Sequence, residues 1–222
     1  DMILIGEPTS VNRLGDTVKI GRRRTVNMWI TVPGSQGHVA YPHRADNPIS
    51  KLARVIAALD ALHLDDGTDA FQASNLEFTA VGTPTRATNI IPGSATAQLN
   101  IRFNNLHRGD ELVELVRRTA EAEAPGTTVE ARISGEAFLT PPGPIYGIVK
   151  EAIEAETGIA PELSTSGGTS DGRFLIRLCP VIDFGLPNGT MHKLDEAVAV
   201  EDLRSLTAIY GRILRQALSK EA

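Results

Sequence analysis

The chain has 222 residues, of which 41% are hydrophobic and 22% are charged, a composition typical of a globular protein with a sizeable core. No apolar run approaches the ~20 residues that span a bilayer, and neither charge sign forms a long block, which disfavours membrane and nucleic-acid partners. We therefore expect a small molecule or another protein as partner. Cys179 is the only cysteine, which excludes an internal disulfide and favours a cytoplasmic location. The chain opens at Asp1 directly into an apolar strand, so we expect upstream sequence to have been removed.

The first elements are two strands and a helix. Residues 3–5 are a continuous apolar run, typical of a strand covered on both faces of an α/β sheet. Residues 26–33 alternate apolar and polar side chains, which predicts a strand with one buried face. Asn47 and Pro48 then supply an N-cap and a first helical residue, and apolar residues recur at helical spacing to about Leu62.

The next segments complete a β-α-β-β-α-β order. Alternation over 76–80 and over 95–103 predicts two antiparallel strands. We expect Asp110 to cap a second helix that stops before Pro125, and residues 129–133 to form the last strand. This order of elements is the ferredoxin-like arrangement.

The remaining segments have the pattern of an α/β domain. Helices are predicted over 145–156 and 202–218, with Gly158 as the C-cap of the first. Residues 180–184 predict a second buried strand. Because only two or three strands lie outside the ferredoxin-like module, the sheet would be incomplete and would leave apolar surface exposed at 3–5 and 180–184.

The predicted fold class is therefore α/β, with one domain inserted into another. Residues 1–24 and 137–222 form the outer, incomplete α/β domain, and residues 25–136 form the inserted ferredoxin-like domain.

Two segments present possible metal ligands at the ends of buried strands. Glu7 follows the strand at 3–5, and His192 lies in the loop after the strand at 180–184, the edge where α/β proteins place their sites. A carboxylate and an imidazole are ligand types that zinc prefers. The alternatives are a surface turn at Glu7 and a solvated histidine at His192, because a separation of 185 positions carries no spacing signal.

Other segments could bind an anion. Small residues over 164–172 let the backbone approach a ligand closely, although a flexible loop explains them equally well. His38 and His43 lie in a loop at the end of a strand, and the alternative is a hairpin-like turn with solvated histidines. The arginines at 22–24 and Arg102 suit carboxylate recognition, and the alternative is ordinary exposed side chains.

Six segments, taken together, resemble one family. They occur in the order found in the succinyl-diaminopimelate desuccinylases, part of a group of dinuclear-zinc metallopeptidases that includes acetylornithine deacetylase and carboxypeptidase G. The segments are 5–9 (IGEPT), 21–23 (GRR), 37–42 (GHVAYP), 87–93 (ATNIIPG), 164–174 (STSGGTSDGRF), and 187–188 with 191–192 (PN and MH).

The resemblance implies a fold and a set of site residues. Residues 25–136 resemble the lid or dimerisation domain that this family inserts into a zinc-peptidase-like α/β catalytic domain, through which two copies form a homodimer. Glu7 would bind one zinc ion and His192 the other, with cobalt a possible substitute for zinc. His38 would reach into the partner's site and stabilise the oxyanion. The implied substrate-binding residues are Arg22, Tyr41, Asn89, Arg102, Gly168 and Thr169.

The reaction implied by the resemblance is amide hydrolysis, in which N-succinyl-LL-diaminopimelate and water give succinate and LL-diaminopimelate, a step toward lysine. The family's other metal ligands and its general-base glutamate precede the segment that begins at Asp1. We therefore expect the chain to bind zinc weakly or not at all and to be inactive alone. Two alternatives remain, a deacylase like acetylornithine deacetylase and a non-catalytic dimerisation module.

Overall fold

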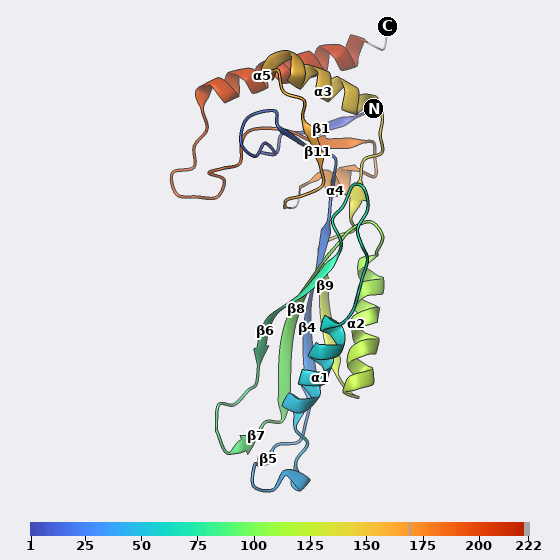
Figure 1. Ribbon diagram of the computed structural model, residues 1–222, viewed down its shortest axis with the longest axis vertical. Coiled ribbons are helices and arrows are strands. Elements are labelled where there is room, and N and C mark those ends of the chain that lie inside the picture. Colours follow the sequence, from blue (N-terminus) through green and yellow to red (C-terminus); the bar gives the residue numbers. More distant parts are fainter. Residues whose placement is uncertain (169, 220–222) are drawn as a thin grey trace. The chain divides into compact units, whose positions relative to one another are not determined.

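The structure, a computed structural model, describes residues 1–168 and 170–219 and divides into two compact units. Unit 1 comprises Asp1–Arg22 and Phe138–Ala222, and unit 2 comprises Arg23–Ala137. Both units combine helices with sheets, as Figure 1 shows, so the predicted α/β class is confirmed. In the described part of the chain, no helix combines the length and apolar character needed to cross a membrane.

Unit 2 has the predicted β-α-β-β-α-β order. Its sheet has the strand order β6-β8-β4-β9 with every neighbouring pair antiparallel, which is the ferredoxin-like topology. The main elements are β4 (Arg24–Pro33), α1 (Pro48–Asp60), β6 (Asn75–Gly82), β8 (Ser94–Phe103), α2 (Gly109–Glu123) and β9 (Thr128–Ile133).

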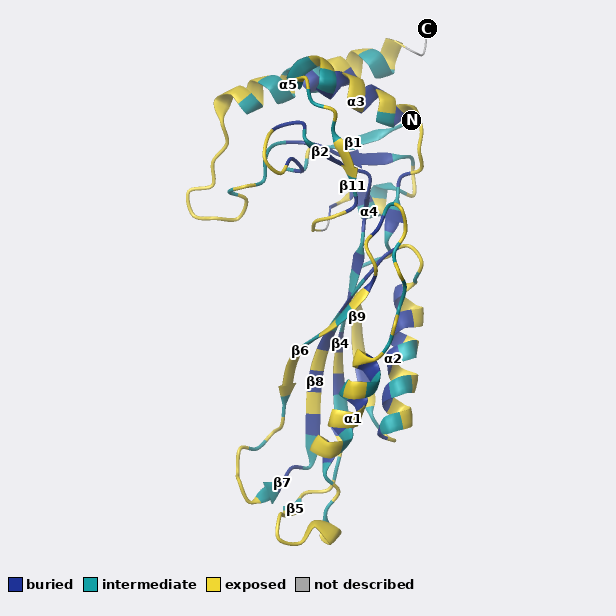
Figure 2. Ribbon diagram, viewed as in Figure 1, coloured by how far each residue is buried: buried dark blue, intermediate teal, exposed yellow. Residues whose placement is uncertain are grey.

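The period-two pattern of β4 decides which face of this sheet is covered. Alternate β4 side chains from Val26 to Val32 are completely buried, whereas Trp29 on the other face is 40% exposed. Helices α1 and α2 both lie against the apolar face, and their buried stripes are visible in Figure 2. Each large apolar side chain buried in this way stabilises the fold by about 1.5–3 kcal/mol.

Short elements at one end of the unit 2 sheet were not predicted. Strand β5 (Gly37–His38) pairs with β7 (Ile90–Ile91), and a 3₁₀ helix, η1 (Pro42–Arg44), follows β5. The amide of Gly34 donates to the carbonyl of Gly93 at 2.9 Å, which ties these segments to the ends of β4 and β8.

The predicted cap of α2 is wrong. The helix begins at Gly109 with Arg108 as its N-cap, and Asp110 lies inside the first turn. There its carboxylate accepts a hydrogen bond from Arg108 Nε at 3.2 Å, and its negative charge suits the helix N-terminus.

Unit 1 contains a four-stranded sheet with the order β1-β12-β2-β11 and a two-stranded pair, β10-β3. Strands β1 and β12 are parallel, β12 and β2 antiparallel, and β2 and β11 parallel. The elements are β1 (Ile3–Ile5), β2 (Thr17–Lys19), β3 (Gly21–Arg22), β10 (Phe138–Leu139), α3 (Pro144–Thr157), β11 (Glu162–Ser164), α4 (Gly172–Leu175), β12 (Val181–Asp183) and α5 (Val200–Leu218).

The core of unit 1 lies between its sheet and two helices. Helices α3 and α5 lie together beside the sheet (Figure 1). Their apolar residues, among them Ile153 and Ile209, pack with Val18 and Ile182 of the sheet. Helix α3 ends where predicted, because Gly158 adopts the left-handed conformation with φ 71° and its amide donates to Glu154 O.

Two expectations about the unit 1 sheet are wrong. The prediction of two or three strands missed β2 and β11, which are only three residues long and carry polar residues at their ends. Residues 180–184 are not an exposed apolar edge, because β12 lies between β1 and β2 and its Val181 and Ile182 are buried. Strand β1 is an edge strand with half-buried side chains.

Candidate functional site

The segments that follow β1 and β12 run side by side in unit 1. The amide of Phe184 donates to Ile5 O and that of Asn188 to Ser10 O, each at 2.9 Å. A Cβ at Gly185 would lie 2.5 Å from the carbonyl oxygen of Glu7, so only glycine permits this approach. The two strand ends that carry the predicted zinc ligands are thus neighbours in the fold.

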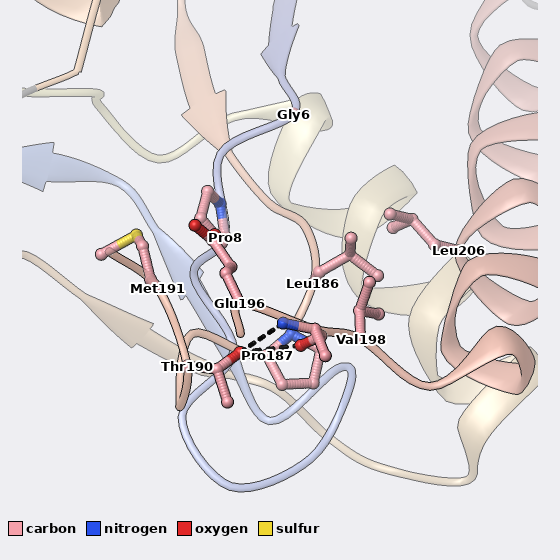
Figure 3. A pocket seen from close by; sticks show the side chains of 10 residues that line it. Gly6, Pro8, Leu186, Pro187, Thr190, Met191, Glu196, Val198 and Leu206 are labelled. Carbon is pink, nitrogen blue, oxygen red and sulfur yellow. Dashed lines mark hydrogen bonds between the residues drawn. The ribbon is translucent and has the colours of Figure 1, made fainter. Parts of the chain in front are cut away.

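A cavity of about 200 Å³ lies beside these two segments. Gly6 and Pro8, which flank Glu7, line it together with Met191, which precedes His192 (Figure 3). Its other lining residues are Leu186, Pro187, Thr190, Glu196, Ala197, Val198 and Leu206. Glu7 is half-buried and His192 is exposed.

The loop that carries His192 is held in an unusual conformation. His192 has φ 62° and Asp195 φ 59°, values that cost non-glycine residues energy and often mark functional positions. Thr190 Oγ1 closes the loop by donating to Ala197 O at 2.7 Å and accepting from Ala197 N at 3.1 Å (Figure 3). The amide of His192 donates to Glu196 Oε2 at 3.4 Å.

Metal ligation needs more groups than this arrangement provides. Over residues 1–168 and 170–219, no group of three or more His, Cys, Asp or Glu side chains could hold a metal ion. A catalytic zinc ordinarily has three protein ligands.

Arg22 is buried in unit 1 and is not part of a solvated basic turn. Its Nη2 and Nε donate to Asp183 Oδ2 at 2.6 and 3.1 Å, and its Nη1 donates to Ser166 O at 3.2 Å. Lys19 lies beside it and donates to the hydroxyls of Ser164 and Ser166 at 3.0 and 2.8 Å. These contacts form a buried polar cluster under the segment 164–168.

The segment 164–168 lies directly on the Arg22 guanidinium. Gly167 has φ 102°, which strains any other residue, and a Cβ there would lie 2.8 Å from Arg22 Nη1, so a side chain would force the guanidinium to shift. Gly168 is exposed, and a Cβ added to it would meet no atom within 4 Å outside its chain neighbours. Thr169, the other residue implied to bind substrate in this segment, lies outside the described residues.

In unit 2, the structure brings His38, Tyr41 and Asn89 together. The His38 and Tyr41 ring centroids are 6.0 Å apart, and Asn89 O accepts a hydrogen bond from Val39 N at 3.1 Å. Ala40 N donates to His38 Nδ1 at 3.0 Å, so the neutral imidazole carries its proton on Nε2. All three residues are exposed, and an Nε2–H group is available to donate to a substrate oxygen.

Arg102 lies at the other end of the unit 2 sheet. It is the second-last residue of β8, roughly 25 Å along the strand from Ser94. His38, Tyr41 and Asn89, here called the His38 group, are found near Ser94. Its side chain is on the polar face of the strand, and Nη1 donates to Thr25 Oγ1 at 2.7 Å. Arg102 and the His38 group are therefore separate features of this unit.

The sequence interpretation missed Lys19 and Asp183. Lys19 lies between the buried residues Val18 and Ile20, and Asp183 between Ile182 and Phe184. A charged residue inside an apolar strand is the signal that could have identified both, because such a group is buried only with a partner.

Residues 20–128 match the family model described as a peptidase dimerisation domain. The chain is 64% identical over 214 residues to a protein of Sphingopyxis alaskensis named succinyl-diaminopimelate desuccinylase, covering 96% of this chain and 57% of the relative. A protein of the same name from Rhizorhabdus wittichii is 61% identical, covering 99% of this chain and 58% of the relative. The chain thus spans less than two thirds of the length of these relatives.

Solved structures share the fold at low sequence identity. An aminopeptidase from Bacillus cereus superposes with a TM-score of 0.75 at 18% identity, covering 92% of this chain and 54% of that chain. An M20 family metallo-carboxypeptidase from Sulfolobus solfataricus superposes with a TM-score of 0.75 at 13% identity, covering 96% of this chain and 63% of that chain. The solved structures show a shared fold, and the curated relatives at 64% and 61% identity confirm the resemblance to the succinyl-diaminopimelate desuccinylases that was drawn from the six sequence segments.

Proposed function

We propose that this chain is part of a metal-dependent amide hydrolase that converts N-succinyl-LL-diaminopimelate and water into succinate and LL-diaminopimelate. The observation that carries the proposal is the pairing of the segments after β1 and β12, which places the chain neighbours of Glu7 and His192 around one cavity. The names of the relatives at 64% and 61% identity support this choice of substrate.

In this proposal, unit 1 contributes part of the catalytic domain and unit 2 is the lid and dimerisation domain, with the boundary near residues 24 and 137. Glu7 and His192 each supply one ligand to a different zinc ion, or to cobalt in its place. Bound metal would make water a stronger nucleophile and polarise the amide carbonyl. Because the described residues do not complete either site, we expect the chain alone to bind zinc weakly and to be inactive.

The protein side chains have separate roles in binding and in charge stabilisation. The exposed Nε2–H of His38 donates to the oxygen that becomes negative as the amide is attacked. Arg22, Arg102, Tyr41, Asn89, Gly168 and Thr169 bind the carboxylate and amino-acid groups of the substrate. A substrate with several carboxylates suits this concentration of arginine.

The distance between the His38 group and Arg102 favours a homodimer. Both would contact the same substrate, yet they lie roughly 25 Å apart along β8 of one unit, which is longer than an acylated diamino acid. In a homodimer, each site could take Arg102 from one copy and His38 from the other, so both residues could contact one substrate. The match of residues 20–128 to a peptidase dimerisation domain supports this arrangement.

A hydrolysis assay tests the proposed reaction. The protein that contains this chain at the full length of its relatives is incubated with zinc and either N-succinyl-LL-diaminopimelate or N-acetylornithine, and the released amine is measured. We expect turnover of the succinyl substrate that stops when a chelator removes the metal and returns when zinc is added back. Preferential turnover of N-acetylornithine would identify the deacylase alternative, and no turnover of either would refute the proposed hydrolase.

The second candidate function is a non-catalytic dimerisation module, which the match of residues 20–128 favours. Strands β6 and β9 form the two edges of the sheet, and the backbone N–H and C=O groups along an edge can pair with a strand of a second copy. Sedimentation velocity of the 222-residue chain without metal should show a concentration-dependent dimer. A monomer at every concentration would contradict pairing through unit 2.

A cytoplasmic location remains part of the proposal.

A further inference from the structure

Lys19 is a buried lysine at the centre of the unit 1 sheet. It is 6% exposed, and strand pairing places it opposite Ser164 of β11 on one side and Asp183 of β12 on the other. Residues at paired positions point to the same face of a sheet, so these three side chains meet on one face. A lysine is rarely buried without a partner, so this position needs an explanation.

The contacts of Lys19 are with the segment 164–168 and not with an acid. Its ammonium donates to Ser164 Oγ and Ser166 Oγ, while the one buried carboxylate nearby, Asp183, is held by Arg22 through Oδ2. Asp16 engages the backbone amides of residues 11–13, and Glu162 is exposed. The positive charge of Lys19 is therefore neutralised only in part by nearby carboxylates.

The balance of charge in this cluster favours an anion. Lys19 and Arg22 carry two positive charges against the single negative charge of Asp183, and all three residues are less than one tenth exposed. Burial, followed by repulsion from Arg22, lowers the pKa of Lys19. Keeping the ammonium charged thus has a cost that a bound carboxylate would reduce.

The same contacts fix the position of the segment 164–168. Lys19 donates a hydrogen bond to the hydroxyl of Ser166, and Arg22 donates one to its carbonyl oxygen, so two cations bind the same residue. Gly167 then crosses the guanidinium too closely for a side chain, and the exposed Gly168 follows. Movement of Ser166 would therefore displace the backbone that the proposed function assigns to substrate binding.

We propose that Lys19 is a positioning residue, which holds the segment 164–168 against Arg22 in the orientation that receives a carboxylate of the substrate. The inference rests on the proposed function for the identity of the substrate, but the anchoring of the segment is a property of this chain alone. Lys19 acts through Ser166 and through its charge, and it does not touch the reacting atoms.

Hydrogen exchange of the 222-residue chain tests the anchor. Lys19→Met keeps the length of the side chain and removes the ammonium, and the matched control is Lys150→Met, since Lys150 is 56% exposed on α3. Amide exchange over residues 164–168 should become about tenfold faster in Lys19→Met and remain unchanged in Lys150→Met. Circular dichroism checks that both variants are folded, and Ser166→Ala, which keeps the charge, should loosen the same amides. Unchanged exchange in a folded Lys19→Met would overturn the proposal.

Kinetics of the complete enzyme test the role in binding. Lys19→Met should raise KM for the succinylated substrate and the inhibition constant of free succinate, each about tenfold, with kcat changed less than about twofold. Lys19→Arg, which keeps the charge, should recover most of the affinity for succinate. A fall in kcat with constant KM, or no change in either, would overturn the role in carboxylate binding. An inactive unmodified enzyme would refute the proposed function instead, while the exchange experiment would still decide whether Lys19 anchors the segment.

Discussion

Asp65 organises the loop between α1 and β6 in unit 2. Its Oδ1 accepts hydrogen bonds from Gly67 N and Asn104 Nδ2, each at 2.7 Å, and its Oδ2 lies 2.9 Å from His107 Nε2. Ser74 N lies 3.2 Å from Oδ2, which ties the far end of the loop to the same carboxylate. One side chain thus joins the loop to the end of β8.

The charge of Asp65 should make unit 2 less stable in acid. Burial alone would raise the pKa of Asp65, but the hydrogen bonds from Ser74, Asn104 and Gly67 outweigh it and lower the pKa below its ordinary value of 3.8. A lowered folded-state pKa gives stability that is present above pH 4 and is lost as the pH falls toward the folded-state pKa.

Asp65→Asn tests this role by urea unfolding. At pH 7 it should reduce the free energy of unfolding by about 2–3 kcal/mol, and the difference from the unmodified chain should shrink at pH 3. Asp66→Asn is the control, because the Asp66 side chain is 94% exposed and its loss should cost less than about 0.5 kcal/mol. A difference that stays constant with pH would contradict the electrostatic role of Asp65.

His38 offers a separate test of the catalytic role given to unit 2. His38→Ala in the complete enzyme should lower kcat about 10²- to 10³-fold with little change in KM, because an oxyanion donor acts mainly in the transition state. His63→Ala is the control, since His63 is 72% exposed and belongs to another loop. Steady-state kinetics showing equal kcat for both variants would exclude His38 as the oxyanion donor.

At the scale of single residues, candidate reactive side chains could be selected from the sequence, but the residues that they contact could not. Glu7 and His192 could be selected because each follows an apolar run and has the chemistry of a metal ligand. The pairing of Arg22 with Asp183 could not be predicted, because 161 positions separate them and they lie on strands of different sheets, β3 and β12, which only the fold of unit 1 brings together. Long-range contacts of this kind depend on the topology of the sheet.

Among the elements, long segments with a clear period were predictable and short strands were not. The alternation in β4 and β8 extends over ten residues each, so packing of one face fixes them as strands. Strands β2 and β11 have three residues each, which is too few to show a period. Hydrogen bonding to neighbouring strands of the sheet, and not their own sequence pattern, makes them strands.

The start of α1 shows how one side chain sets an element boundary. Asn47 Oδ1 accepts a hydrogen bond from Ile49 N at 3.0 Å, and Pro48 occupies the first helical position. Asn47→Ala should lower the free energy of unfolding by about 1 kcal/mol, whereas Ser50→Ala, at an exposed position in the same turn, should change it by less than about 0.5 kcal/mol. Equal thermal unfolding curves for both variants would show that the cap contributes nothing.

At the scale of the whole molecule, unit 1 leaves part of its core uncovered. Met2 and Leu4, beside and within the edge strand β1, line an apolar cavity of about 300 Å³ with Tyr210, Ile213, Leu214 and Ala217 of α5. The chain also spans only 57% of its relative from Sphingopyxis alaskensis. Both observations agree with the proposed assignment of unit 1 as part of a catalytic domain.

The zinc content of the complete enzyme tests most directly whether Glu7 and His192 belong to one dinuclear centre. The unmodified enzyme should bind two zinc ions, and Glu7→Gln and His192→Ala should each lose tight binding of one of them, measured by calorimetric titration. The exposed His63→Ala should retain both ions. Two tightly bound zinc ions in both site variants, or tight stoichiometric binding by the 222-residue chain alone, would contradict the proposed site.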